Sequence, residues 1–304
     1  MNGNRLQRSL KQIGNALVGA LAVGLLKLLR LISYDRCADG AAWVARTFGP
    51  LVREHRIGRA QLTAAFPEKS PAEIERILNG VWDNLGRLVA DFAHLDRLMA
   101  DAVAPHKPSR LDFSDRSADI YIKLQNDGKP ALAFAAHYGN WEMPAMCARY
   151  TGLESAVLYR GPNIDAVERW VEETRAPLMG DMIRTGLDAP VKLADALGRG
   201  THVGILVDQY YVRGVDVTFF GRKTKANPLV ARLAQHFNCP IHGTRITRLP
   251  GNKFWGEVTE EIEPARLPNG EVDIQGTMQR ITDVVEGWVR ENPEQWLWLH
   301  RRWR

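Results

Sequence analysis

Short apolar runs that alternate with helical patterns constrain the fold of this 304-residue chain most strongly. Runs of strand length lie at 131–136, 156–159 and 203–207. Apolar residues recur at helical spacing in the segments that follow these runs, which are 164–175, 191–197 and 229–237. Two later β-rich runs, 241–249 and 253–262, precede a helical pattern at about 273–290. Strands that alternate with helices predict an α/β fold, here a mixed β-sheet flanked by helices.

The first third of the chain has a different pattern, which is helical from Asp35 to about residue 110. Within it, Ser70-Pro71-Ala72-Glu73 has the form of a helix start. No internal repeat, low-complexity stretch or obvious linker interrupts the sequence. We therefore expect a single α/β domain over 35–304, with a helical N-terminal portion at 35–110 and the core at 111–304.

The segment 1–34 contains no acidic residue. Three basic residues precede an uncharged run of fifteen residues at 12–26, and Lys27 and Arg30 follow it. As a helix that run measures about 22 Å, less than the roughly 30 Å hydrocarbon core of a bilayer, unless the basic side chains extend to the interface. We expect a retained membrane anchor that spans the bilayer or lies in its interface. The alternatives are a cleaved signal peptide, for which no small-x-small cleavage site follows, and a buried helix of the domain.

The charge balance favours an anionic partner, because 40 Lys and Arg residues against 35 Asp and Glu residues give a formal net charge of +5. Nucleic acid does not fit, since the basic residues are distributed and no helix-turn-helix, RNP or zinc-finger signature occurs. Cys37, Cys147 and Cys239 form no CxxC pair, and the histidines show no ligand spacing. We therefore expect neither a metal site nor a disulfide framework.

The most informative segment begins where the apolar run 131–136 ends at His137, with Glu142 five residues later. The two side chains cannot share one helical face, but a turn through Gly139 and a helix near 141–144 would bring the carboxylate back onto the imidazole. A carboxylate that accepts the ring N–H fixes the tautomer and makes the other nitrogen a general base. No GxSxG nucleophile elbow occurs, so such a dyad would deprotonate a substrate hydroxyl directly. A structural histidine at a strand end is the alternative.

His-x4-Asp/Glu after an apolar strand resembles the signature of membrane acyltransferases. Further blocks narrow the resemblance to the bacterial lipid A biosynthesis acyltransferases, the late lauroyl and myristoyl transferases. These blocks are 59–62, 65–70, 82–87, Tyr159-Arg160 with Asn163, Arg175, 200–209, 219–221, 228–231 and 293–298. Two positions depart from the usual pattern: Asn227 precedes Pro228 where Thr is more common, and Tyr210 stands where an acidic residue or histidine is common. The departures bear on substrate detail rather than on the reaction.

The resemblance implies a membrane acyltransferase-like catalytic core at 111–304. It implies transfer of a fatty acyl group from acyl carrier protein to a hydroxyl of a lipid A precursor, at the cytoplasmic face of the inner membrane. No cofactor is implied beyond the acyl donor itself. The partners would be acyl carrier protein, the precursor glycolipid and anionic lipids of the inner membrane. An acyltransferase for another glycolipid, such as a phosphatidylinositol mannoside, and a non-catalytic membrane-associated lipid-binding protein are the alternatives.

Within that resemblance, His137 is the general base, Glu142 orients it, and no acyl-enzyme forms. Arg175 is the first candidate to stabilise the developing negative charge or to orient the acceptor, because a guanidinium presents several donors in one plane. A solvated charge on a helix is the alternative interpretation of Arg175.

Three further residues are candidates for substrate binding. Arg160 follows a predicted strand and could hold a phosphate or carboxylate, with a structural salt bridge as the alternative. Asp208 and Gln209 follow the run 203–207, at the strand end where α/β folds place functional groups. They would bind substrate or orient neighbouring basic side chains.

Overall fold

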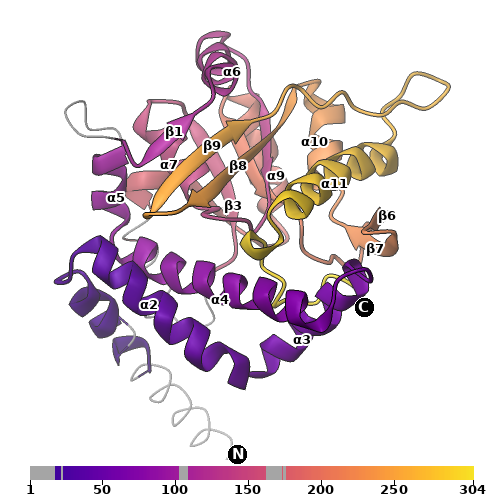
Figure 1. The fold of residues 1–304 in the computed structure, drawn as a ribbon. Coiled ribbons are helices and arrows are strands. Elements are labelled where there is room, and N and C mark those ends of the chain that lie inside the picture. The colour runs from indigo at the N-terminus through magenta and orange to yellow at the C-terminus, as the bar shows by residue number, and fades with distance from the viewer. Residues whose placement is uncertain (1–17, 22, 103–108, 162–172, 174–175) are drawn as a thin grey trace, which may run out of the picture.

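The computed structural model of the chain describes residues 18–21, 23–102, 109–161, 173 and 176–304 (Figure 1). Helical backbone at 18–21 and 23–29 precedes the elements named here. The helices are α2 (Tyr34–Phe48), η1 (Gly49–Leu51), α3 (Arg53–Ala65), α4 (Pro71–Ala93), α5 (Leu95–Ala102), α6 (Asp115–Asn126), α7 (Met143–Tyr150), α9 (Ala189–Gly198), α10 (Leu229–Phe237), α11 (Ile274–Glu291) and η2 (Pro293–Gln295).

The strands form one mixed seven-stranded sheet and one hairpin. They are β1 (Leu111–Phe113), β2 (Leu132–Ala135), β3 (Ser155–Tyr159), β4 (Asp181–Arg184), β5 (His202–Leu206), β6 (Val215–Phe219), β7 (Arg222–Ala226), β8 (Ile241–Leu249) and β9 (Lys253–Val258). The order in the sheet is β1-β9-β8-β2-β5-β3-β4, with β8 and β9 antiparallel and the other neighbours parallel. The predicted α/β class with a mixed sheet flanked by helices is confirmed.

The two faces of the sheet differ in side-chain size. In β2, Leu132 and Phe134 are fully buried, and Phe134 stacks on Trp288 of α11 with ring centroids 5.7 Å apart. Helices α9, α10 and α11 cover this bulky face. The alternate residues of β2, Ala133 and Ala135, point to the opposite face, beneath α6 and α7. Small side chains on that face leave space between the sheet and its covering helices.

Helix α4 lies across the carboxyl ends of the parallel strands, with α2 packed along it (Figure 1). It starts as the sequence predicts, with a capping box in which Ser70 and Glu73 exchange side-chain and backbone hydrogen bonds. Asn84 Nδ2 donates to the carbonyl of Gly139 at 3.2 Å and to that of Gln295 at 3.4 Å. Through these bonds α4 supports the loop that follows β2.

A buried ion pair joins the end of α4 to the sheet. Asp91 is fully buried, and its Oδ2 accepts from Arg248 Nη2 of β8 at 2.5 Å and from Asn140 Nδ2 at 2.7 Å. Tyr34 donates its hydroxyl to Asp91 Oδ1 at 2.8 Å. Asn140 Oδ1 in turn accepts from the first backbone N–H groups of α7. The network therefore fixes the turn after His137 between α4 and α7.

Several boundaries differ from the sequence-based expectations. Strand β9 ends at Val258 rather than at 262, because the side chain of Thr259 accepts from Gly243 N at 2.8 Å in place of a regular ladder bond. Short polar strands such as β1 and β4, and the β6–β7 hairpin, were not predicted, since three to five residues carry little periodicity. The predicted helix at 164–175 lies almost entirely outside the described residues.

Most of the predicted anchor, 1–34, also lies outside the described residues. In the part of the chain that the structure does describe, no helix combines the length and the apolar character needed to cross a bilayer. The described stretch 18–32 leaves large apolar side chains exposed to solvent. These are Val18, Leu21, Leu25, Leu28, Leu31 and Ile32.

Replacement of Arg248 by Met should destabilise the fold by about 3–5 kcal/mol, because it leaves the buried carboxylate of Asp91 without its counter-charge. Urea unfolding followed by tryptophan fluorescence measures the change. Arg116→Met is the matched control, since Arg116 and Glu260 form an exposed pair that contributes little to stability. If the Arg248 variant unfolded with the same midpoint urea concentration as the wild type, the pair would not contribute to stability as expected.

Candidate active site

The site lies at the carboxyl edge of the parallel strands, where β2 and β5 end side by side. The register pairs Ala135 with Leu206, so the residues two positions further along, His137 and Asp208, emerge as neighbours. Asp208 Oδ1 lies 2.9 Å from His137 Nδ1. The other oxygen, Asp208 Oδ2, accepts the backbone N–H of His137 at 2.9 Å. One carboxylate thus holds both the main chain and the ring of His137.

The C-terminal part of the chain completes the support of this pair. Trp296 is fully buried, and its indole Nε1 donates to Asp208 Oδ2 at 2.7 Å. The backbone N–H of Leu297 donates to the carbonyl of His137 at 2.9 Å, and Gly139 N–H donates to the carbonyl of Gln295 at the same distance. The segment 295–297 therefore lies against the turn and limits its movement.

Gly139 is required for the turn that carries His137. Its φ is +54°, in the left-handed region, and a Cβ at this position would lie 1.9 Å from the carbonyl oxygen of Ile246. Because the backbone passes so close to β8, a side chain at Gly139 would displace the loop. The turn through Gly139 and the helix near 141–144 that the sequence predicts are both present, with α7 starting at Met143 and Pro144 at its second position.

The charges of His137 and Asp208 shift the pKa of each group so that the imidazole takes up a proton more readily and the carboxylate less readily. Burial would lower the pKa of His137, but the charge of Asp208 and its hydrogen bond, with a further contribution from Glu142, raise the pKa above its ordinary value. Burial would raise the pKa of Asp208, yet the charge of His137 and the hydrogen bonds from it bring that pKa well below the usual range. Asp208 is therefore ionised at neutral pH, and Nδ1–H of His137 donates to it.

With Nδ1 protonated, Nε2 of a neutral His137 carries an electron pair that can accept a proton. The His137 side chain is 15% exposed, whereas that of Asp208 is only 1% exposed. His137, but not Asp208, also lines a cavity on the small-residue face of the sheet. His137 can therefore act as a base at the cavity, and the buried Asp208 stabilises the positive charge that the ring gains on protonation.

Asp208 thus occupies the place on Nδ1 that the sequence analysis assigns to Glu142. The physical reason is the sheet register, which brings 137 and 208 together from strands distant in sequence. Glu142 lies beyond the turn as the N-cap residue of α7, where its backbone N–H donates to Asn140 Oδ1 at 3.1 Å. It lines the cavity beside Trp141 and acts on His137 through its charge.

The other predicted site residues are Gln209, Arg160 and Arg175. Gln209 lines the cavity, with its Nε2 3.4 Å from His137 Nε2. Arg160 follows β3, is exposed to solvent, and lines the cavity as well. Arg175 lies outside the described residues. The structure therefore brings His137, Gln209, Arg160 and Glu142 together around one cavity, with Asp208 buried beside His137.

Sequence reasoning missed the contributions of Trp296 and His300. The ring of His300 lies 6.3 Å from that of His137 and 5.1 Å from that of Trp296, between centroids. Its Nδ1 donates to the carbonyl of Leu297 at 2.6 Å, and burial lowers its pKa. His300 is thus a neutral neighbour of the pair. The sequence pointed to this region only through the matching block at 293–298, which includes Trp296 but not His300. That block says nothing about contact with His137.

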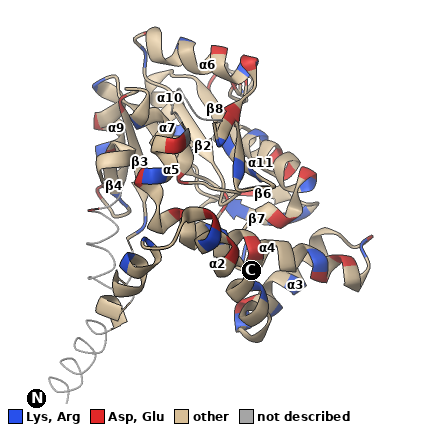
Figure 2. Ribbon diagram, turned by 60° about the vertical axis from the view of Figure 1, so that its left-hand side comes forward, with Lys and Arg blue, Asp and Glu red and all other residues tan. Residues whose placement is uncertain are grey.

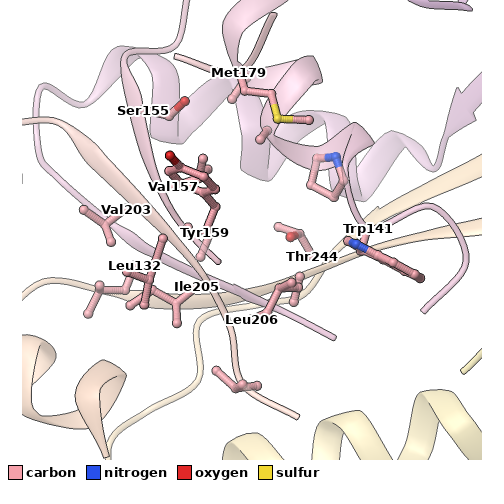
Figure 3. A pocket seen from close by; sticks show the side chains of 18 of the residues that line it. Leu132, Trp141, Ser155, Val157, Tyr159, Met179, Val203, Ile205, Leu206 and Thr244 are labelled. Atoms are coloured by element: carbon pink, nitrogen blue, oxygen red, sulfur yellow. The ribbon is translucent and has the colours of Figure 1, made fainter. Parts of the chain in front are cut away.

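The cavity measures about 530 Å³ and extends along the sheet beneath α7. Figure 3 shows Ser155, Val157 and Tyr159 along β3, with Met179, Thr244 and Trp141 around the same space. Its lining residues run from Ala131, before β2, to His137, after β2. Its lining is mostly apolar, and His202 and His242 lie near the amino ends of their strands, opposite His137. A long apolar chain with a polar reacting end fits this shape.

No group of three or more His, Cys, Asp or Glu side chains within the described part of the chain is arranged to hold a metal ion. Cys147, which is partly buried, has a pKa raised by burial to about 12, so its thiolate is disfavoured at neutral pH.

Comparison with known proteins identifies similar sequences. The sequence model of one family, described as bacterial lipid A biosynthesis acyltransferase, matches residues 5–304. A lipid A biosynthesis palmitoleoyltransferase of Escherichia coli (strain K12) is 25% identical over 269 residues, which cover 86% of this chain and 81% of that protein. A lipid A biosynthesis acyltransferase of Shigella flexneri is similar to the same extent.

Replacement of Asp208 by Asn should lower the pKa of His137, because it removes the negative charge that offsets burial of the ring. Titration of the histidine ring resonances by NMR measures the shift. Asp195→Asn, on the exposed surface of α9, should leave the His137 resonances unchanged. An unchanged or higher pKa of His137 in the Asp208 variant would contradict this account of the pair.

Proposed function

This chain belongs to the bacterial lipid A biosynthesis acyltransferase family and is an acyltransferase, and we propose that it moves a fatty acyl group from acyl carrier protein to a hydroxyl of a lipid A precursor. The observation that carries the proposal is the His137–Asp208 pair at a long apolar cavity. The pair supplies a base for a hydroxyl, and the cavity supplies space for an acyl chain.

The reaction is a single displacement. His137 Nε2 takes the proton of the acceptor hydroxyl as its oxygen attacks the thioester carbonyl. The carbon–sulfur bond then breaks, and the carrier thiolate receives the proton from the imidazolium. Asp208 stabilises the imidazolium between these transfers, as its ionised state and its hydrogen bond to Nδ1 allow. No protein nucleophile takes part, so no acyl-enzyme forms.

The carbonyl oxygen gains negative charge during the attack and needs donors. The amide of Gln209 lies on the cavity side of His137 and is the nearest candidate. Arg160 lines the same opening and supplies positive charge for the oxyanion or for an anionic group of a substrate. Arg175 keeps the role that the sequence suggests, charge stabilisation or orientation of the acceptor, as part of the proposal.

The acyl chain would lie on the small-residue face of the sheet. Ala133 has a small side chain and its neighbour Gly204 has none, which leaves room on the floor of the cavity, and His242 lies on the other side of Ala133. The cavity, whose lining residues run from Ala131 to His137, would hold an extended acyl chain. The carbonyl end would then meet His137.

The enzyme would act at the cytoplasmic face of the inner membrane. The exposed apolar side chains between Val18 and Ile32, together with the basic residues of the first 34 positions, suit an anchor that lies in an anionic interface.

In the reaction itself, the negative charge of Glu142 would assist His137 as the base. The reaction requires no cofactor besides the acyl donor.

Purified protein, supplied with acyl-acyl carrier protein and a lipid A precursor, tests the proposal. His137→Ala and Asp208→Asn should each lower kcat by about 100- to 10,000-fold, because general-base catalysis contributes that much. Glu142→Gln should have a smaller effect, because the charge of Glu142 contributes less to the raised pKa of His137 than Asp208 does. Mass spectrometry of the product glycolipid measures the rates, and Asp195→Asn is the control.

Wild-type turnover by the His137 variant would exclude the proposed base. If Glu142→Gln lowered kcat more than Asp208→Asn did, Glu142 rather than Asp208 would be the residue that orients His137.

A further inference from the structure

A second hollow, of about 820 Å³, lies between α3, the start of β7 and the C-terminal segment. Its volume falls within the range of about 300–1,000 Å³ that is typical of small-molecule sites. Five of the residues that line it are arginines, and none of its lining residues in the described part of the chain is acidic. We call it the arginine pocket. The arginines are Arg53, Arg56, Arg222, Arg301 and Arg304.

The arginines of this pocket are not neutralised. None of them forms an ion pair with a carboxylate in the described residues. Arg59, on the same helix as Arg53 and Arg56, contrasts with them, because it pairs with Glu75 and lies outside the pocket. Converging positive charges without counter-charges create a strong local field that attracts an anion.

The pocket is held in a defined shape by buried contacts. Gln61 of α3 accepts the backbone N–H of Arg302 at 2.7 Å and donates to the carbonyl of Trp298 at 3.0 Å. Thr224 Oγ1 of β7 donates to the carbonyl of Arg302 at 2.7 Å. Arg302 is buried, whereas its neighbours Arg301 and Arg304 are exposed. In Figures 1 and 2 the C-terminal end lies beside α3 and β7.

The pocket adjoins the candidate active site. His300, whose ring lies 6.3 Å from that of His137, immediately precedes Arg301. The guanidinium of Arg304 lies 5.0 Å from the ring centroid of Tyr210, and Tyr210 lines the acyl cavity. A ligand with an anionic group in the arginine pocket could therefore extend a neighbouring group to His137.

We propose that the arginine pocket binds a phosphate group of the acceptor, that is, of a phosphorylated sugar headgroup. This inference rests on the proposed function and names a binding site for its acceptor. Planar guanidinium groups match the geometry of phosphate oxygens and bind them with paired hydrogen bonds. Trp303 also lines the pocket, and its ring packs against the guanidinium of Arg222, 4.6 Å from the ring centroid. The concave form suits a small headgroup.

The double variant Arg56→Gln/Arg301→Gln tests the site in the full-length protein. With a phosphorylated precursor, its KM for the acceptor should rise roughly 10- to 100-fold, the loss expected for hydrogen bonds to a charged group. With the same precursor after phosphatase treatment, the variant and the wild type should have equal KM values. The KM for acyl carrier protein should not change. Arg199→Gln is the control, since Arg199 precedes β5 at the opposite edge of the sheet.

Three results would overturn the proposal. A higher KM for acyl carrier protein, with that for the acceptor unchanged, would make the pocket a carrier-docking site. Weaker sedimentation with phosphatidylglycerol vesicles, with unchanged KM values, would make it a membrane contact. Equal losses with the phosphorylated and the dephosphorylated acceptor would reduce it to a structural role.

Direct binding separates this inference from the proposed function. One outcome is that the wild type transfers no acyl group but binds the phosphorylated precursor more tightly than the dephosphorylated one, and that the double variant loses this preference. The proposed function would then be wrong, and the phosphate site would be confirmed. If neither precursor binds preferentially while transfer proceeds, the pocket fails and the function stands.

Discussion

The carboxylate of Asp208 is the contact on which the geometry of the site depends. It joins three segments that are distant in sequence: its own position after β5, the ring and backbone of His137 after β2, and the indole of Trp296 near the C-terminus. Burial of a charge is costly unless it is paired and hydrogen-bonded, and here three hydrogen bonds compensate it. The same bonds that stabilise the buried charge thus position the catalytic candidate.

Side-chain size on the two faces of the sheet explains where the ligand space lies. Phe134 and its buried neighbours fill the face toward α11, whereas Ala133, Ala135 and Gly204 leave the opposite face open beneath α7. Strand alternation converts a run of alanines in the sequence into the floor of a cavity. The C-terminal segment lies between this apolar cavity and the arginine pocket, with His300 near His137 and Arg301 lining the pocket.

The sequence predicted elements with strong periodicity and a local motif, but not contacts across the sheet. The strand before His137, the turn at Gly139 and the helix after it were all predicted, because each is encoded within a dozen residues. The partner of Nδ1 was not, since Asp208 reaches His137 only through the pairing of β2 with β5, 71 residues apart in sequence. The arginine pocket was missed for the same reason: its residues come from three separate segments.

The pH dependence of kcat/KM tests the central claim, that Asp208 sustains His137 as the base, most directly. The rate should fall as the pH drops through the raised pKa of His137, because the protonated ring cannot accept a proton. In Asp208→Asn this acid limb should move to lower pH and the maximum rate should fall, whereas Asp195→Asn should leave the profile unchanged. An acid limb at the wild-type pH in the Asp208 variant would contradict the account.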